Sequence, residues 1–220
     1  MSVGVLVPAA GLGLRLGPGG PKALRELAGE PLLVHAVRGL RACRSVGPVV
    51  VAAPAADVKA VGALLAAYDV KVVAGGAERQ DSVRAALAAL PAEVDLVLVH
   101  DAARCLTPVG VVEAVIAALR GGAIAVVPVL AVADTVKQVD GNHVALTVDR
   151  SSLVSAQTPQ GFTREVLERA HAAGGDTLTD DAGLVEALGL PVVTVAGSDE
   201  GFKVTRPLDL LLAEAVLRAR

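Results

Sequence analysis

A glycine-rich loop near the start of the chain carries two cationic side chains. An apolar run over Val3–Val7 leads into the segment that contains Pro8, Ala9, Ala10, Gly11, Gly13, Arg15 and Lys22. Glycines let a backbone approach a ligand closely, and exposed N–H groups together with cations bind phosphates. Leu16 stands where a dinucleotide fingerprint needs glycine, and the Gly-Lys-Ser/Thr of a P-loop is absent. The loop therefore predicts a polyphosphate site outside these two common nucleotide folds.

Other polar residues gather where further apolar runs end. These segments are 75–82, 100–104, 133–135, 147–150, 157–160, 179–181 and 201–207. Ligands of open parallel sheets bind beyond the carboxyl ends of the strands, so the segments predict one cleft.

Four of these polar residues have both a functional and a structural interpretation. Asp101 is either a helix cap or a carboxylate for Mg2+, in a site where substrate phosphates supply most of the ligands. His100 is interpreted as packed rather than catalytic. Lys203 and Arg150 are either site cations or solvated surface charges.

Two neighbouring charged pairs are expected to be structural. Glu78 and Arg79 are expected to pair with each other at the surface, where an ion pair contributes little. Of Asp180 and Asp181, at least one is expected to cap a helix.

The composition limits the class of protein. The 220 residues are 53% hydrophobic and 1% aromatic, with a net charge of −3. Neither a basic excess nor aromatic stacking platforms are available, which argues against nucleic-acid binding. Cys43 and Cys105 show no metal-ligand spacing, and the uncharged stretch 121–133 is too short to span a bilayer. We expect a soluble, cytoplasmic protein that is not bound to a membrane.

Apolar runs alternate with segments of helical period. The predicted strands are Val3–Val7, Val49–Ala53, Val70–Val73, Leu96–Val99, Ala123–Val129 and Val192–Val195. The predicted helices are Pro31–Cys43, Asp57–Tyr68, Asp81–Leu90, Pro108–Leu119, Thr163–His171, Asp181–Leu188 and the segment from Pro207 onward. This alternation predicts an α/β fold with a Rossmann-like, mainly parallel twisted sheet and helices on both faces.

The alternation breaks at a predicted β-hairpin. Thr135–Val139 and Val144–Val148 alternate apolar and polar residues around a turn at Gly141. A two-stranded hairpin is marginal alone, so we expect a projecting arm over about residues 132–152 that a second copy of the chain covers. Without repeats or linkers, residues 1–220 are expected to form a single domain with this arm inserted.

Together the motifs resemble one family over nearly the whole chain. They are Pro8-Ala-Ala-Gly11-x-Gly13-x-Arg15, Pro21-Lys22, Gly75-Gly76-x-x-Arg79-x-Asp81-Ser82, Val99-His-Asp-Ala-Ala-Arg104, Asp134-Thr135-x-Lys137, Thr147-Val-Asp-Arg150, Thr158-Pro-Gln160, Thr179-Asp-Asp-Ala182 and Lys203-Val-Thr-Arg-Pro207. The set is similar to the 2-C-methyl-D-erythritol 4-phosphate cytidylyltransferases. The resemblance implies transfer of a cytidylyl group from CTP to methylerythritol phosphate, in the non-mevalonate isoprenoid pathway.

The resemblance also implies roles for individual residues. The catalytic cations are Arg15, Lys22, Arg150 and Lys203. The CTP-binding residues are Pro8, Ala9, Ala10, Gly11, Gly13, Gly75, Gly76, Ala77, Ser82, Asp101 and Ala102. The acceptor-binding residues are Asp101, Arg104, Thr135, Arg150, Thr158, Thr179 and Lys203. Asp101 holds Mg2+ or another divalent cation. In the family's arm-exchanged homodimer, Thr135 and Arg150 serve the partner's site.

The chemistry agrees with this set of residues. A phosphate monoester is largely dianionic at pH 7, since its second pKa is about 6, so the nucleophile needs no general base. Such a site should be rich in Lys and Arg and poor in His. Two departures from the family pattern are Cys105, where proline is frequent, and Ala77, where aspartate is frequent. Ribitol 5-phosphate cytidylyltransferase and a non-catalytic nucleotide-binding regulator remain alternatives.

Overall fold

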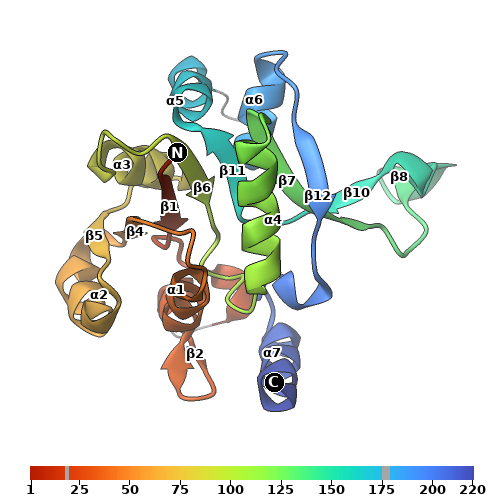
Figure 1. The fold of residues 1–220 in the computed structure, drawn as a ribbon. Helices are drawn as coiled ribbons and strands as arrows, with labels where there is room; N and C mark the ends of the chain where they lie inside the picture. The colour runs from red at the N-terminus through yellow and green to blue at the C-terminus, as the bar shows by residue number, and fades with distance from the viewer. Residues whose placement is uncertain (18–19, 175–178) are drawn as a thin grey trace.

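A computed structural model describes residues 1–17, 20–174 and 179–220. Its centre is an eight-stranded sheet with strand order β10-β7-β11-β6-β1-β4-β5, to which β12 adds beside β7. The strands are β1 (Val3–Pro8), β4 (Val49–Ala53), β5 (Lys71–Ala74), β6 (Leu96–Val99), β7 (Ala125–Ala131), β10 (Val154–Ala156), β11 (Gln160–Thr163) and β12 (Val193–Ala196). Figure 1 shows β1 and β6 in the middle of the fold.

The half of the sheet formed first along the chain is parallel. β1 lies between β4 and β6, and β4 also pairs with β5, all in parallel register. Parallel strands end at the same edge, so the segments that follow β1, β5 and β6 lie together. The predicted cleft is expected at this edge.

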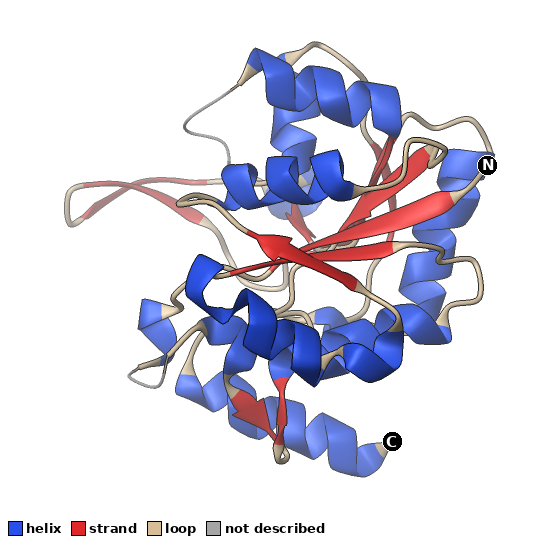
Figure 2. Cartoon of the chain, turned by 90° about the vertical axis from the view of Figure 1, so that its left-hand side faces the viewer, coloured by secondary structure: helices blue, strands red, loops and turns tan. Residues whose placement is uncertain are grey.

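Helices cover both faces of the sheet, as Figure 2 shows. The helices are α1 (Leu32–Ala42), α2 (Val58–Leu64), α3 (Arg79–Ala89), α4 (Val109–Arg120), α5 (Arg164–Ala173), α6 (Asp181–Ala187) and α7 (Pro207–Ala219). Residues of α1, α2 and α4 join one core cluster with alternate residues of β1, whereas α3, α5 and α6 join a second cluster. The two clusters follow from the two-residue period of a strand, which sends successive side chains to opposite faces. The predicted α/β class with helices on both faces is confirmed.

The predicted hairpin is present as a separate two-stranded sheet. It consists of β8 (Lys137–Asp140) and β9 (His143–Thr147), which pair antiparallel. The hairpin projects from the body of the molecule (Figures 1 and 2). Its apolar side chains Val139, Val144 and Leu146 are 60%, 61% and 48% exposed. The arm therefore exposes apolar surface within this one chain.

The sheet is mixed because two strands, β10 and β11, run antiparallel to their neighbours. β11 pairs antiparallel with both β6 and β7, and β10 pairs antiparallel with β7. The sequence of β11, Gln-Gly-Phe-Thr, has a single large apolar residue and gives no strand signal. A short two-stranded ladder of β2 (Glu26–Leu27) and β3 (Glu30–Pro31) was likewise not predicted.

Two predicted helices differ in extent from the structure. α3 begins at Arg79 rather than at Asp81. The predicted helix Asp57–Tyr68 consists of α2 between two short 3₁₀ turns.

Among the described residues, no helix has both the length and the apolar character to cross a membrane. The single-domain boundary stays a prediction.

Candidate active site

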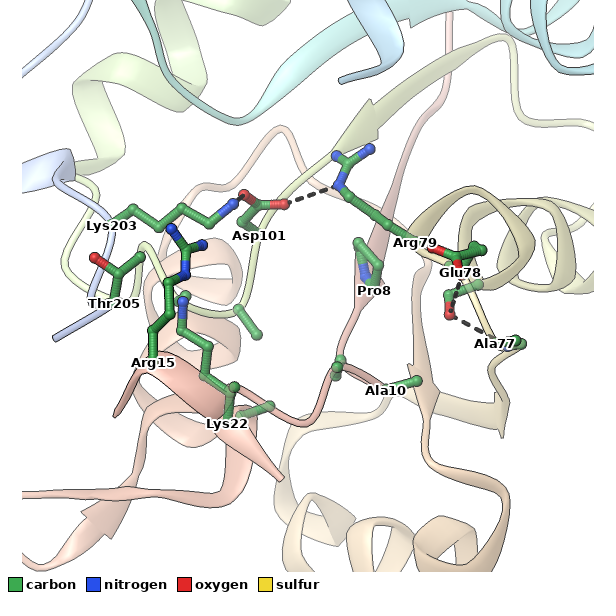
Figure 3. Close-up of a pocket in the computed structure, with 18 residues that line it drawn as sticks. Pro8, Ala10, Arg15, Lys22, Ala77, Glu78, Arg79, Asp101, Lys203 and Thr205 are labelled. Carbon is green, nitrogen blue, oxygen red and sulfur yellow. Dashed lines mark hydrogen bonds and ion pairs between the residues drawn. The ribbon is translucent and has the colours of Figure 1, made fainter. Parts of the chain in front are cut away.

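A pocket of about 260 Å³ lies where β1, β5 and β6 end (Figure 3). Thirteen of the predicted site residues line it: Pro8, Ala9, Ala10, Gly11, Gly13, Arg15, Lys22, Gly76, Ala77, Ser82, Asp101, Ala102 and Lys203. The lining also includes residues without a predicted role, which are Ala23, Glu78, Arg79, Ala103 and Thr205. The structure thus brings the glycine loop and three of the four predicted catalytic cations to one place.

The glycine loop folds back so that Lys22 lies against Gly13. The Lys22 N–H donates to the Gly11 carbonyl at 3.1 Å, and Leu16 N–H donates to Gly13. Gly13 has a φ of +67°, and a Cβ placed there would lie 2.4 Å from Lys22 Cβ. Glycine is required at position 13 both for the positive φ and for this close approach.

The second glycine segment packs against the first turn of α3. A Cβ on Gly75 would lie 2.8 Å from Ala10 Cβ and 2.7 Å from Ser82 Oγ. The Gly76 N–H donates to Ser82 Oγ at 3.2 Å. Gly75 is not among the lining residues, and Ala77 presents a methyl group to the pocket. On this side the pocket offers a ligand backbone groups and the Ser82 side chain.

Lys22 is crowded by other positive charges. Burial and the nearby Lys203 lower the pKa of Lys22 to about 8, although Asp101 acts in the opposite direction. Arg15 also acts to lower this pKa. Three cations of like charge around one pocket predict an anionic ligand, which would relieve their mutual repulsion.

Asp101 is the carboxylate in the middle of these cations. Asp101 lies two residues after the end of β6. Lys203 Nζ lies 2.6 Å from its Oδ2, and Arg79 Nε lies 3.3 Å from its Oδ1 (Figure 3). Burial acts to raise the pKa of Asp101, but Arg79 and Lys203 outweigh it and hold the pKa well below its usual value. Asp101 is therefore ionised at any physiological pH.

Lys203 lies on an extended segment before α7 that the body of the protein holds in place. The Val204 N–H donates to the Ala103 carbonyl at 2.8 Å. Arg104 donates to the Gly201 carbonyl at 2.8 Å and to the Ala156 carbonyl at 3.0 Å. Arg104, predicted to bind the acceptor, is not among the lining residues and instead links the segment of Lys203 to β10.

Arg79 was missed as a site residue, and its expected surface pair with Glu78 is wrong. Its partners are two carboxylates far away in the sequence, Asp101 at 3.3 Å and the buried Asp181 at 2.7 Å. Burial acts to lower the pKa of Arg79, but Asp181 and Asp101 outweigh it and raise the pKa. The signals available were its position directly after Gly75–Glu78 and its place in the motif Gly75-Gly76-x-x-Arg79.

Thr158 and His100 lie behind Asp101. The Asp101 N–H donates to Thr158 Oγ at 3.0 Å, and Thr158 Oγ lies 3.1 Å from His100 Nδ1. Both side chains are buried, and burial lowers the pKa of His100 to about 4, so its ring is neutral. His100 is packed, as expected. The hydroxyl of Thr158 is engaged inside the protein, and its acceptor-binding role stays a prediction.

Thr135, Arg150 and Thr179 are exposed and do not line the pocket of their own chain. Arg150 begins a 3₁₀ turn at the base of the arm, where it donates to the carbonyls of Val132 and Ala133. Thr179 precedes Asp180, which caps α6 by accepting from Gly183 N–H at 3.0 Å. The expected cap is thus provided by Asp180.

The donor set tests whether a divalent cation fits this site. Within the part of the chain that the structure describes, no group of three or more His, Cys, Asp or Glu side chains could form a cage. Asp101 is an ionised carboxylate that contacts Lys203 in a pocket lined mainly by cations, with Glu78 as the other acidic lining residue. Mg2+ is commonly bound by one or two carboxylates and by substrate phosphates, so Asp101 fits a cation that arrives with a nucleoside triphosphate.

Both cysteines of the chain are buried. Cys105 is a buried free thiol, and burial raises its pKa to about 12, so it is not a nucleophile. Cys43 is also free and buried.

An α/β sheet whose strand ends carry a glycine loop and a ring of cations defines the nucleotidyltransferase class. Comparison with known proteins gives the finer result. The family model "2-C-methyl-D-erythritol 4-phosphate cytidylyltransferase" matches residues 3–219. This chain belongs to that family.

Individual relatives and solved structures agree. Proteins of that name from Saccharopolyspora erythraea and Streptomyces avermitilis are 58% and 55% identical, over 99% and 98% of this chain and 100% and 91% of their own lengths. A crystal structure of a protein of that name from Thermus thermophilus matches with a TM-score of 0.82 and 40% identity, covering 99% of this chain and 100% of the other. A synthase structure from Anaerococcus prevotii matches with a TM-score of 0.86 and 27% identity, covering 99% and 98%.

Proposed function

We propose that this protein transfers the cytidylyl group of CTP to 2-C-methyl-D-erythritol 4-phosphate, as a step of the non-mevalonate isoprenoid pathway. An oxygen of the acceptor phosphate attacks the α-phosphorus of CTP and forms a new P–O bond. The bond from the α-phosphorus to the oxygen that bridges it to the β-phosphorus breaks, and pyrophosphate leaves with the electron pair. The products are 4-diphosphocytidyl-2-C-methyl-D-erythritol and pyrophosphate.

The observation that carries this proposal is the grouping of Arg15, Lys22 and Lys203 around the pocket that the glycine loop lines. The reaction brings two anions together and spreads negative charge over the α-phosphorus, and fixed cations stabilise that charge. In our proposal Arg15 and Lys22 act on the CTP phosphates, while the loop N–H groups and Ser82 line the cytidine. Lys203 and Arg150 orient the acceptor phosphate.

We propose that Asp101 is the protein ligand of Mg2+ or another divalent cation. The metal would supply charge neutralisation of the triphosphate. The chain's own part is to present one oxygen of Asp101 to the cation. Lys203, whose side chain is 39% exposed, can then leave Asp101 and turn to the acceptor phosphate.

We further propose a homodimer in which each arm reaches the other protomer. The exposed apolar side chains of β8 and β9 support it, because a lone hairpin does not bury its own apolar side chains. In such a dimer Thr135 and Arg150, at the base of the arm, would serve the partner's pocket. A cytoplasmic location is part of the proposal, supported by the two free buried thiols.

The test is CTP-dependent release of pyrophosphate with methylerythritol phosphate and, separately, with ribitol 5-phosphate. We expect turnover with Mg2+ and the first acceptor, and a much lower kcat/KM with the second. A preference for ribitol 5-phosphate would assign the alternative acceptor. CTP binding without turnover on either acceptor would favour a nucleotide-binding regulator.

A further inference from the structure

A chain of ion pairs runs from the pocket into the interior of the protein. Arg79 Nε lies 3.3 Å from Asp101 Oδ1, and Arg79 Nη1 lies 2.7 Å from Asp181 Oδ2. The other oxygen of Asp181, Oδ1, lies 2.9 Å from His171 Nε2. The four side chains come from α3, the end of β6, α6 and α5, and so connect one edge of the site to two helices.

The inner pair of this chain is fully enclosed. The side chain of Asp181 is 0% exposed and that of His171 is 3% exposed. An ionised carboxylate only accepts hydrogen bonds, so His171 Nε2 carries a hydrogen and donates it to Asp181. A buried charge is costly unless it is paired and hydrogen-bonded. Here Oδ1 of Asp181 is hydrogen-bonded to His171, whereas Oδ2 makes no hydrogen bond within the described part of the chain and is paired only with the charge of Arg79.

The backbone around Asp181 is fixed as well. Gln160 Nε2 donates to Asp180 Oδ2 at 2.6 Å, and Gln160 Oε1 accepts from the Ala182 N–H at 3.0 Å. Asp180 in turn caps α6 through the Gly183 N–H. Asp181 is thus held from both of its sequence neighbours, and its carboxylate has one defined orientation.

The two cations that contact Asp101 therefore differ in kind. Lys203 is on a loop with a half-exposed side chain, whereas Arg79 is on a helix and pairs with a second carboxylate that is fully buried. We propose that the His171–Asp181 pair is a positioning unit, which holds the Arg79 guanidinium at the pocket when Lys203 leaves Asp101 for the acceptor phosphate and Asp101 contacts a divalent cation. Without the His171–Asp181 pair, the Arg79 guanidinium would be free to move with the Asp101 carboxylate and neutralise its charge. This inference rests on the proposed function of the pocket.

The experiment is a double-mutant cycle between His171 and Arg79. His171→Phe removes the donor and keeps a ring, and it is made in the wild-type and Arg79→Gln backgrounds. We measure kcat and KM for CTP, CTP affinity with and without MgCl2 by calorimetry, and thermal stability. In the wild-type background we expect a loss of about 10- to 100-fold in kcat/KM for CTP, as for other residues that orient a ligand-binding group. In the Arg79→Gln background we expect no further loss, because the effect of His171 passes through Arg79.

Two further variants distinguish positioning from folding. His171→Gln offers a side-chain N–H again and should recover part of the activity. His35→Phe is the matched control, since His35 is also a buried histidine whose Nε2 contacts a carbonyl, that of Leu27, away from the pocket. It should lower thermal stability while leaving kcat/KM for CTP unchanged.

Equal losses in the two backgrounds, or an unchanged CTP affinity and kcat/KM in His171→Phe, would overturn the positioning role. If His171→Phe does not fold, Asp181→Asn takes its place in the same cycle, because it keeps the shape of the side chain. A wild-type protein that binds CTP without turnover would refute the proposed function alone. The calorimetric arm of the cycle would then still decide the positioning role.

Discussion

Lys22 has a charge that depends on pH near neutrality. Burial and Lys203 lower its pKa to about 8, so the side chain is charged below pH 8 and neutral above it. The kcat/KM for CTP reports the pKa of the free enzyme. We expect this quantity to fall as pH rises through 8, by about tenfold per pH unit above it. A profile that stays flat to pH 10 would contradict the argument. Lys22→Arg, whose guanidinium stays charged, should lose this fall whatever its absolute rate.

Removal of the Lys22 charge should affect chemistry more than binding. The charge matters most when negative charge develops on the α-phosphorus, so Lys22→Ala should lower kcat by about 10²- to 10³-fold. CTP affinity should change far less, because Arg15 and the loop N–H groups remain. Steady-state kinetics and calorimetry on the same preparations check this. Lys59→Ala, an exposed lysine in α2, is the control and should behave as wild type. An unchanged kcat in Lys22→Ala would refute the catalytic role.

The loop between β1 and Lys22 depends on close contact as much as on flexibility. Gly13 and Gly17 both have positive φ, at +67° and +86°, but only at Gly13 would a Cβ meet another group, Lys22 Cβ at 2.4 Å. Alanine at either position pays about 1–2 kcal/mol for the left-handed backbone. Gly13→Ala must in addition displace Lys22, and a small misplacement of a catalytic group is costly. We expect similar losses of thermal stability in the two variants. Only Gly13→Ala should also lower kcat, by about tenfold or more. Equal kcat values would show that the contact is unimportant.

The elements that the sequence predicts well are those with a strong local period. β4 and β6 have the predicted bounds because each is a short, fully apolar run rich in valine. β11 was not predicted, since it is a strand only by virtue of its neighbours β6 and β7. Arg79 was missed for a similar reason. Its partners Asp101 and Asp181 are 22 and 102 positions away, and nothing local indicates them.

The predicted site residues also fall into two groups, those of the glycine loop and those of the arm. The glycine loop is local in sequence, and its residues line the pocket together. Arg150 and Thr135 are local to the arm, which projects from the body that carries the pocket. Their predicted role in the partner's pocket depends on contacts between two chains.

Arg150 should affect the acceptor rather than CTP. It lies at the base of the arm and is not a lining residue of its own chain's pocket. Arg150→Ala is expected to raise KM for methylerythritol phosphate and lower kcat, with CTP affinity unchanged. Arg120→Ala, which removes an exposed arginine at the end of α4, is the control. A selective loss of CTP affinity in Arg150→Ala would contradict the assignment.

In the proposed exchange of arms, each pocket contains residues of two chains. Mixing two variants with reduced activity tests this. Arg150→Ala keeps Lys22, and Lys22→Ala keeps Arg150. After subunit exchange, half of the dimers are hybrids, and in each hybrid one pocket combines an intact Lys22 with the partner's intact Arg150. The mixture should therefore recover about a quarter of the wild-type activity, in the statistical limit for a symmetric dimer. Recovery should vanish when the arm is shortened to remove β8 and β9. If Lys22 and Arg150 act within one chain, the mixture will show no more activity than the average of its two components.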